Sequence, residues 1–227
     1  PHLLWARYDA TTAPAPFIWV YPFEEYHEWA GSSDNRLPEI YFGDWFIRQA
    51  INNGFPLNTI ISTGSFQQVL QQTPGYFNQS VLLSVVPSPG SSLEKALISF
   101  VENGGRLMIY GPSDHAGPAF AKLLNLGKSN PLSGIFGITS VIKGDLLQQP
   151  YPDSIRHQAL FSGGGISSVI RNKTDPNTTL LASVTQSGNS RDVAWSRNDP
   201  AWKGGGVVYV RGTNSSSFNG GKLLAPD

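Results

Sequence analysis

The chain has 227 residues and no net charge, because 16 Lys and Arg residues are balanced by 16 Asp and Glu residues, and it contains no cysteine. Only 14% of the residues are charged, against about 25% in an average protein, so we expect no basic surface able to bind a nucleic acid. The absence of cysteine excludes disulfides, thiolate nucleophiles and cysteine-ligated metal centres. No cofactor and no metal site are predicted.

The beginning of the chain, residues 1–5, has neither an initiator methionine nor the charged and hydrophobic regions of a signal peptide. We therefore expect a processed chain or a segment of a longer one. No apolar run approaches the ~20 residues that cross a bilayer, so no membrane partner is predicted. An extracellular or periplasmic location is favoured by the low charge and by four Asn-x-Ser/Thr triplets, which begin at Asn78, Asn172, Asn177 and Asn214.

The first half of the chain alternates between apolar strands and helices. Residues 1–16 are rich in proline and predict an extended lead-in. Strands are then predicted at 17–21, 57–62, 81–86 and 106–111, and helices at 39–53, 65–72, 92–102 and 117–126. Strands that are apolar almost throughout and alternate with helices are typical of a parallel sheet that is buried on both faces.

The helix at 92–102 has the clearest start signal. Ser91 and Glu94 form a capping box, in which the Ser91 hydroxyl accepts from the Glu94 amide and the Glu94 carboxylate reaches back to the Ser91 amide. Residues 103–105, Asn-Gly-Gly, end this helix before the next strand.

The second half is richer in Gly and Ser and predicts strands with few helices. We expect strands at 135–142, 166–170, 180–185, 192–196 and 206–211, a hairpin turn at 187–190, and turns at the glycine runs 163–165 and 204–206. The predicted fold class is α/β: a doubly wound, mostly parallel sheet of flavodoxin-like or amidotransferase-like type with an antiparallel β extension in the C-terminal half. The predicted organisation is a lead-in (1–16), an α/β core (17–126) and a β-rich extension (127–227) that completes the same domain.

Two segments resemble a known superfamily. Residues 92–111, SLEKALISFVENGGRLMIYG, are similar to the helix, Gly-Gly turn and strand of the class I glutamine-amidotransferase-like superfamily, and residues 202–212, WKGGGVVYVRG, resemble its late strand. The similarity is greatest to non-catalytic members such as the middle, trimer-forming domain of bacterial β-galactosidases. It covers residues 17–126 and 191–212.

The resemblance implies a test of activity. Catalytic members carry a cysteine in the tight turn after the strand that corresponds to 107–110, and a histidine after the late strand. Here the turn reads Gly-Pro-Ser-Asp-His at 111–115, and all four histidines precede residue 158. Glutaminase activity is therefore not expected.

The same turn partly matches the G-x-S-x-G pattern of serine hydrolases, with Ser113 as nucleophile. Such a serine needs a separate base within ~3 Å. His157 and Asp114 are the candidate partners, whereas His115 is too close along the chain to face Ser113. The alternative interpretation is that Ser113 or Asp114 caps the following helix.

Two further groups of residues are candidates. Glu24 and Glu25 follow the first strand, and paired carboxylates carry out glycoside hydrolysis when ~5–9 Å apart, although a polar loop or a short helix is the alternative. A saccharide or subunit contact is predicted in the second group, where aromatic rings flank planar polar side chains. That group comprises Trp195, Trp202, Arg197 and Asp199, with His115 as a further ligand-binding candidate.

These patterns predict a non-catalytic, amidotransferase-like accessory domain of a larger carbohydrate-active protein, with other domains of the parent chain or like subunits as partners and with a role in packing or in lining a sugar site. Two alternatives remain open. One is a hydrolase that uses Ser113 or the Glu24 and Glu25 pair, and the other is a carbohydrate-binding module.

Overall fold

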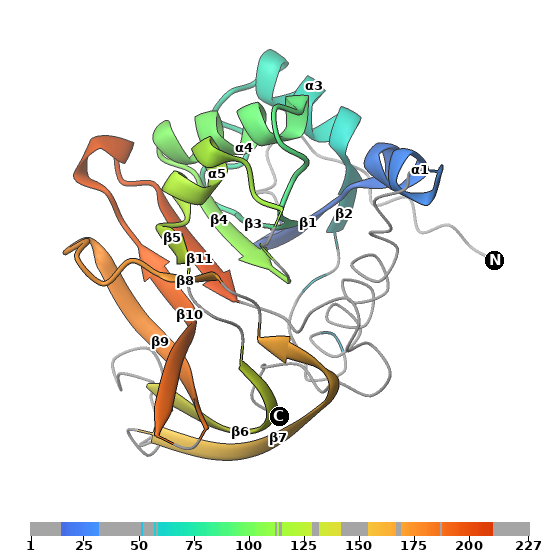
Figure 1. The fold of residues 1–227 in the computed structure, drawn as a ribbon. Helices are drawn as coiled ribbons and strands as arrows, with labels where there is room; N and C mark the ends of the chain where they lie inside the picture. Colours follow the sequence, from blue (N-terminus) through green and yellow to red (C-terminus); the bar gives the residue numbers. More distant parts are fainter. Residues whose placement is uncertain are drawn as a thin grey trace.

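A nine-stranded sheet lies at the centre of the part of the chain that the computed structural model describes, which comprises residues 15–31, 51, 57, 59–111, 113, 115–128, 132–141, 154–166, 169–186 and 188–210. The strand order is β2-β1-β3-β4-β11-β10-β9-β6-β7 (Figure 1). A second, two-stranded sheet pairs β5 with β8. In chain order the strands are β1 (Phe17–Tyr21), β2 (Thr59–Ser62), β3 (Val81–Val85), β4 (Arg106–Tyr110), β5 (Leu126–Lys128), β6 (Leu132–Val141), β7 (Ser154–Ile166), β8 (Val169–Arg171), β9 (Thr178–Gln186), β10 (Asn189–Arg197) and β11 (Gly206–Val210).

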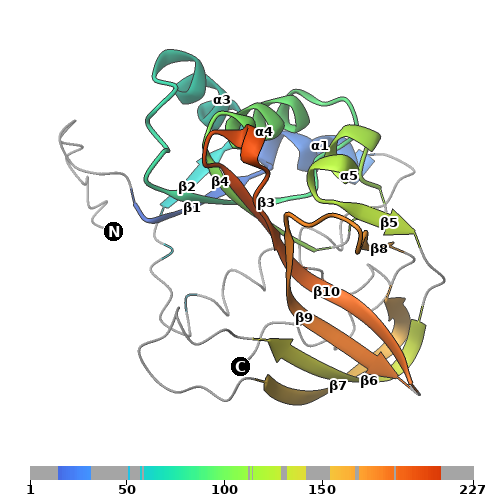
Figure 2. The same ribbon diagram turned by 90° about the vertical axis from the view of Figure 1, so that its left-hand side faces the viewer.

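The sheet is parallel from β2 to β11 and antiparallel from β11 to β7. Three helices cover one face of the parallel part, as Figures 1 and 2 show from two sides: α3 (Thr63–Gln72), α4 (Ser92–Glu102) and α5 (Pro118–Leu123). The helix α1 (Phe23–Gly31) follows β1, and the short 3-10 helix η2 (Pro200–Trp202) precedes β11. The predicted fold class, an α/β sheet with an antiparallel C-terminal part, is confirmed.

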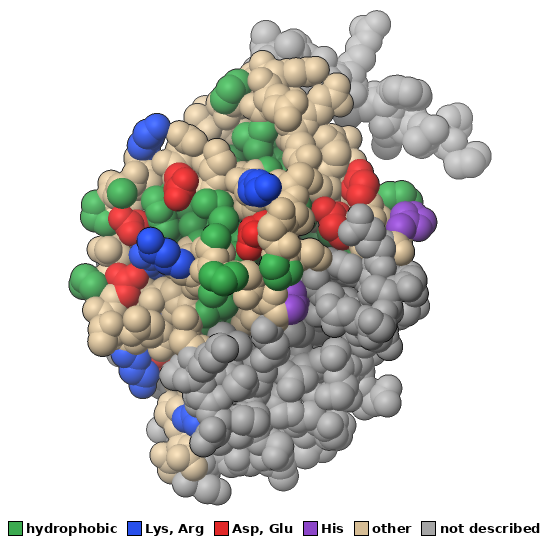
Figure 3. Space-filling model, turned by 45° about the horizontal axis from the view of Figure 1, so that its top comes forward, with side chains coloured by type: hydrophobic (Ala, Val, Ile, Leu, Met, Phe, Trp, Pro, Cys, Tyr) green, Lys and Arg blue, Asp and Glu red, His purple; other side chains and the backbone are tan. Residues whose placement is uncertain are grey.

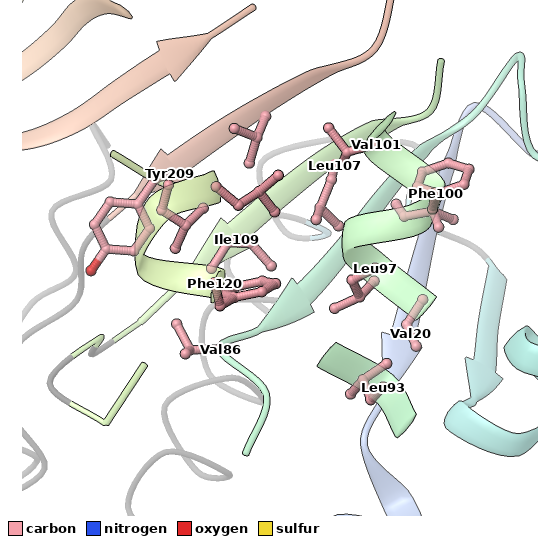
Figure 4. Packing of buried hydrophobic residues seen from close by; sticks show 14 of the residues in the cluster. Val20, Val86, Leu93, Leu97, Phe100, Val101, Leu107, Ile109, Phe120 and Tyr209 are labelled. Atoms are coloured by element: carbon pink, nitrogen blue, oxygen red, sulfur yellow. The ribbon is translucent and has the colours of Figure 1, made fainter. Parts of the chain in front are cut away.

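The main apolar core lies between the parallel strands and α3, α4 and α5 (Figure 4). Val20, Leu107 and Ile109 point from the strands toward Leu97 and Phe120 on the helices, and all of these side chains are almost completely buried. Because alternate residues of a strand face opposite sides of a sheet, the intervening side chains build a second cluster.

That second cluster contains a hydrogen bond between distant strands. The Trp19 Nε1 of β1 donates to the Tyr110 hydroxyl of β4 at 2.7 Å, and both side chains are buried. Burial raises the pKa of Tyr110 well above its usual value, so its hydroxyl stays neutral and holds the two strands together on this face.

The start of α4 confirms the predicted cap and corrects one of its bonds. The Ser91 hydroxyl accepts from the Glu94 amide at 3.1 Å. The Glu94 carboxylate, however, accepts from the Gly90 amide at 2.6 Å, not from the Ser91 amide, which instead donates to the Ser88 carbonyl. Gly90 has a φ of +73°, and this left-handed turn brings its amide to the carboxylate.

In the second half of the chain, β6, β9, β10 and β11 agree with predicted strands, whereas β7 was not predicted apart from its last residue. The hairpin of β9 and β10 turns between Gln186 and Asn189, in the region predicted for it. The glycine run 163–165 was predicted as a turn, and this is wrong, because these residues lie in the long strand β7, where Gly165 pairs with Ser133 of β6. Glycine weakens a strand, so the local sequence favoured a turn. β6 instead pairs with β7 on both sides of a register shift, in which residues 162–164 lie between the pairs of Phe161 with Gly134 and of Gly165 with Ser133.

Two other predictions have different outcomes. Residues 23–31 form α1, which agrees with the short-helix alternative for this segment. The helix predicted at 39–53 lies outside the described residues except for Ile51, and so does most of the predicted lead-in. Among the described helices, none is long and apolar enough to span a membrane.

The neighbouring strands β4 and β11 approach each other through glycines at their beginnings. The Gly206 amide donates to the Gly105 carbonyl at 3.0 Å, and the Gly205 amide donates to the Trp202 carbonyl at 2.7 Å. A methyl group on Gly205 would collide with the carbonyl oxygen of Val101 in α4, and one on Gly105 would collide with the Phe100 ring. Only glycine permits this contact between the backbone of α4 and the turn before β11.

We predict that Gly205→Ala lowers the free energy of unfolding by about 1–3 kcal/mol or more, because the added methyl group forces backbone apart in a packed region. Urea denaturation measures this change. Gly75→Ala is the matched control: its methyl group would meet only the Asn78 side chain at an ordinary 3.5 Å, and we expect an effect within about 0.5 kcal/mol. Equal effects of the two substitutions would contradict the close packing at Gly205.

Candidate functional site

The turn after β4 lies where α/β folds usually bind ligands, at the carboxyl end of a parallel strand. Gly111 begins the turn with a φ of +94°, and its amide donates to the Val210 carbonyl of β11 at 3.0 Å. Ser113, which occupies the position of the superfamily nucleophile in the resemblance, is only 2% exposed. The turn therefore brings the candidate nucleophile inward, against β11.

The Tyr209 hydroxyl of β11 occupies the space beside this serine. It lies 2.7 Å from Ser113 Oγ and donates to the Gly111 carbonyl at 3.0 Å. A phenol has one proton to donate, and the Gly111 carbonyl can only accept, so Tyr209 donates to that carbonyl. In the 2.7 Å contact the Ser113 hydroxyl is then the donor and the Tyr209 oxygen the acceptor. Ser113 is thus hydrogen-bonded to a neutral phenol, which is not a general base at neutral pH.

His115 lies in the same turn but faces another element. Its Nε2 lies 3.2 Å from the Val86 carbonyl at the end of β3, and because a carbonyl only accepts, this nitrogen carries a proton. The imidazole therefore links the turn after β4 to the end of β3. It is half-buried, and the structure assigns it a contact within the fold and not a role as the base for Ser113.

The other predicted hydrolase partners do not complete a triad among the described residues. His157 lies on β7, and four strands (β11, β10, β9 and β6) separate β7 from β4 in the sheet. Asp114 lies outside the described residues. The strand order thus gives no reason to expect a base next to Ser113.

Glu24 and Glu25 both hold the beginning of α3. The Glu25 carboxylate, which is 7% exposed, accepts from the Thr63 hydroxyl at 2.9 Å, and Glu24 accepts from the Gly64 amide at 3.2 Å. Carboxylates stabilise a helix N-terminus because the first amides lack partners within the helix. These contacts give the pair a structural role, in fixing α1 against α3.

The predicted ligand-binding residues Arg197 and Asp199 belong to a compact ion-pair cluster. Arg197 Nε donates to Asp175 at 2.6 Å, one terminal nitrogen donates to Asp199 at 3.1 Å, and the other donates to the Leu123 carbonyl at 3.2 Å. The guanidinium also lies 4.7 Å from the centre of the Trp202 ring. Because these contacts engage both edges and one face of the guanidinium, Arg197 joins α5, the turn before β9 and η2.

The two predicted sugar-stacking rings are buried. Trp195 is 1% exposed, and its Nε1 donates to the Leu124 carbonyl at 2.7 Å, while Trp202 is 6% exposed and lies under Arg197. A ring covered by protein has no free face for a sugar, so the structure does not support the surface contact that was predicted at these residues. Alternation along β10 places Trp195 toward the helices and into the core.

Two residues that organise these sites could not be recognised from the sequence. Tyr209 sits at an inward position of a buried strand, and a buried tyrosine hydroxyl requires a partner, but its partners are 96 and 98 residues away along the chain. Asp175 lies in a polar turn whose sequence does not indicate that it pairs with Arg197. No three His, Asp or Glu side chains gather as a potential metal site in the part of the chain that the structure describes.

No protein-family model matches this sequence, and no curated protein matches it significantly. Two solved structures of Gan42B, a GH42 β-galactosidase from G. stearothermophilus, are similar to it with TM-scores of 0.53 and 0.52 at 12% identity. Each match covers 92% of this chain and 28% of the β-galactosidase chain. The chain therefore has a fold like that of a part of this glycoside hydrolase.

Two further solved structures have lower scores. The exo-β-1,4-mannosidase Op5Man5 from Opitutaceae bacterium strain TAV5 matches with a TM-score of 0.48 at 13% identity, over 86% of this chain and 31% of that chain. A GMP synthase component from Thermoplasma acidophilum matches with a TM-score of 0.44 at 11% identity, over 88% of this chain and 84% of that chain. Both scores are too low to establish a shared fold.

The ion-pair cluster predicts how stability depends on pH. Burial would raise the pKa of Asp175, but hydrogen bonds from Arg197 and from the Asn177 amide outweigh this effect and lower the pKa below its usual value. A carboxyl whose pKa is lower in the folded state stabilises the fold above its unfolded pKa, and the contribution is lost as the pH falls below it. We expect the free energy of unfolding to fall as the pH drops below about 4.

Asp175→Asn tests this assignment. We expect the variant to be about 1.5–3 kcal/mol less stable at pH 7, because the Arg197 guanidinium loses a charged hydrogen-bond partner, and to show a smaller loss of stability on acidification. The measurement is urea denaturation between pH 3 and pH 7. Asp199→Asn serves as the control, since Asp199 is more exposed and should contribute less. If both variants lose stability on acidification as the unmodified chain does, Asp175 is not the responsible group.

Proposed function

We propose that this chain is a non-catalytic, amidotransferase-like accessory domain of a larger carbohydrate-active protein, where it packs against other domains of the parent chain or against like subunits. The observation that carries the proposal is that Ser113 is buried and hydrogen-bonded to Tyr209. At the turn where the superfamily carries its nucleophile, this chain has a serine that is 2% exposed and lies 2.7 Å from the Tyr209 hydroxyl. A nucleophile needs access to substrate and a base, and this serine has neither among the described residues.

The similarity to a part of a glycoside hydrolase supports the accessory role. A match over 92% of this chain and 28% of the Gan42B chain is the relation expected when one domain corresponds to a segment of a larger enzyme. At 12% identity the similarity concerns the fold, so the carbohydrate-active parent and the extracellular or periplasmic location remain parts of the proposal. The balanced charge of the chain suits a surface that meets protein or neutral sugar.

The two alternatives have less support. A hydrolase would need Ser113 exposed or Glu24 and Glu25 free, whereas both carboxylates accept hydrogen bonds from the start of α3. A carbohydrate-binding module that uses Trp195 and Trp202 would need exposed indole faces, and both rings are buried.

Sedimentation velocity on the full-length product of the gene tests the packing role. We predict that deletion of residues 15–210 changes the assembly state beyond the loss of mass, because a domain interface is removed. A second arm adds the isolated 227-residue chain to the deletion product, and we expect the two to associate. Association in this arm also shows that the deletion product is folded well enough to bind the isolated chain.

Ser113→Ala in the full-length protein is the control for catalysis. We expect its assembly to be unchanged, and its turnover of glycosides and esters to stay within about twofold, since a change at a residue outside the reaction leaves transition-state stabilisation intact. The proposal fails if the gene encodes nothing beyond this chain, if the deletion leaves assembly unaltered, or if Ser113→Ala abolishes turnover.

A further inference from the structure

A groove of about 540 Å³ runs between α3 and α4 on the helical side of the molecule, away from the turn after β4. This volume falls within the range of small-molecule sites, about 300–1,000 Å³. Leu70 and Ala96 supply partly exposed apolar surface along it, and the buried Phe100 also lines it. Figure 3 looks onto this side, where Lys, Arg, Asp and Glu side chains are interspersed with hydrophobic side chains and other surface.

The polar side chains of the groove are nearly all uncharged. Carboxamides come from Gln67 and Gln71 of α3, from Asn78 after it and from Asn103 at the end of α4, and the groove also has the hydroxyls of two serines. Among the described residues that line it, Lys95 is the one charged side chain, and none is a carboxylate.

This composition follows from an unusual stretch of sequence. Residues 49–93 contain no Asp, Glu, Lys, Arg or His, although 14% of the chain is charged. The stretch includes the whole of α3, a helix with exposed residues that would ordinarily carry charged side chains on its outer face. Here four glutamines take that place, so the uncharged groove is a property of the local sequence as well as of the packing.

Part of the groove is held in place by hydrogen bonds across the helices. Gln67 Nε2 donates to the Ser92 hydroxyl at 3.0 Å, which joins α3 to the start of α4. Asn103 Nδ2 donates to the Ser99 carbonyl at 2.9 Å, and its Oδ1 accepts from Lys203 at 2.9 Å. Gln71 and Asn78 are exposed, so their carboxamides are accessible to a ligand, and each presents both a donor and an acceptor.

We propose that the groove between α3 and α4 binds an uncharged saccharide. Sugar hydroxyl groups both donate and accept, which carboxamides and serine hydroxyls match, while the C–H face of a pyranose ring suits the partly exposed apolar surface of Leu70 and Ala96. One lysine and no carboxylate in the lining favour an uncharged ligand over an anion or a cation. A protein interface concentrates aromatic and apolar residues at its centre, whereas this concave surface is rich in carboxamides.

Titrations of the chain, produced in a host without N-glycosylation, test the proposal. The probes are cellobiose, mannobiose, galactobiose and lactose at millimolar concentrations, and binding is followed by ligand-observed NMR. We expect at least one of them to bind. Gln71→Ala and Asn78→Ala should each raise its Kd by about 2- to 12-fold, the loss of one neutral hydrogen bond. Ser99→Trp, which places an indole in the groove, should abolish binding.

Gln68→Ala and Gln72→Ala are the matched controls, because both residues are exposed glutamines of α3 that do not line the groove. Their Kd should stay within about twofold of the unmodified chain. The proposal is overturned if none of the four disaccharides binds, if the groove variants bind as well as the controls, or if a glucuronic-acid disaccharide binds more tightly in a way that depends on Lys95. Because the titrations use this chain alone, their outcome is independent of whether the chain packs in a larger protein.

Discussion

The parallel pairing of β4 with β11 is the contact on which the rest of the structure depends. The two strands lie 100 residues apart in sequence and pair in register from Gly206 with Arg106 to Val210 with Tyr110. On its other side β11 pairs antiparallel with β10, so this single strand joins the parallel α/β half to the antiparallel half. Glycines at 105, 205 and 206 make the junction possible, since a side chain at any of them would meet occupied space.

The same pairing determines the chemistry of the turn after β4. With β11 in register, Tyr209 stands beside Gly111 and Ser113, and its hydroxyl contacts both. The carboxyl end of β4, where α/β folds usually bind ligands, is thereby occupied by an internal hydrogen-bond network. The Ser113 and Tyr209 hydroxyls find partners within the fold, and these hydrogen bonds stabilise the sheet. Surfaces available to a partner or ligand then lie elsewhere, and the uncharged groove of α3 and α4 is one of them.

The features that sequence alone could predict were local. Apolar runs located β1, β3 and β4, and the Ser91 cap located the start of α4 within a residue. Both signals depend on residues that are close together in the sequence. What failed depended on distant partners. The glycines at 163–165 lie in a strand because β6 pairs with β7 on both sides of them, at Phe161 and at Gly165. Trp195 is buried because β10 lies beside β11 under the helices. Ser113 could be named as a candidate, but Tyr209, which decides its state, could not be placed beside it without the fold.

The central claim is that Ser113 is closed against substrate by Tyr209. Reaction with a small fluorophosphonate, followed by intact-mass spectrometry of the native chain, tests this most directly, because such reagents modify a serine that is accessible and activated by a base. We predict no adduct on the chain under conditions in which a serine hydrolase in the same tube is fully modified. A stoichiometric adduct that peptide mapping places on Ser113 would contradict the claim.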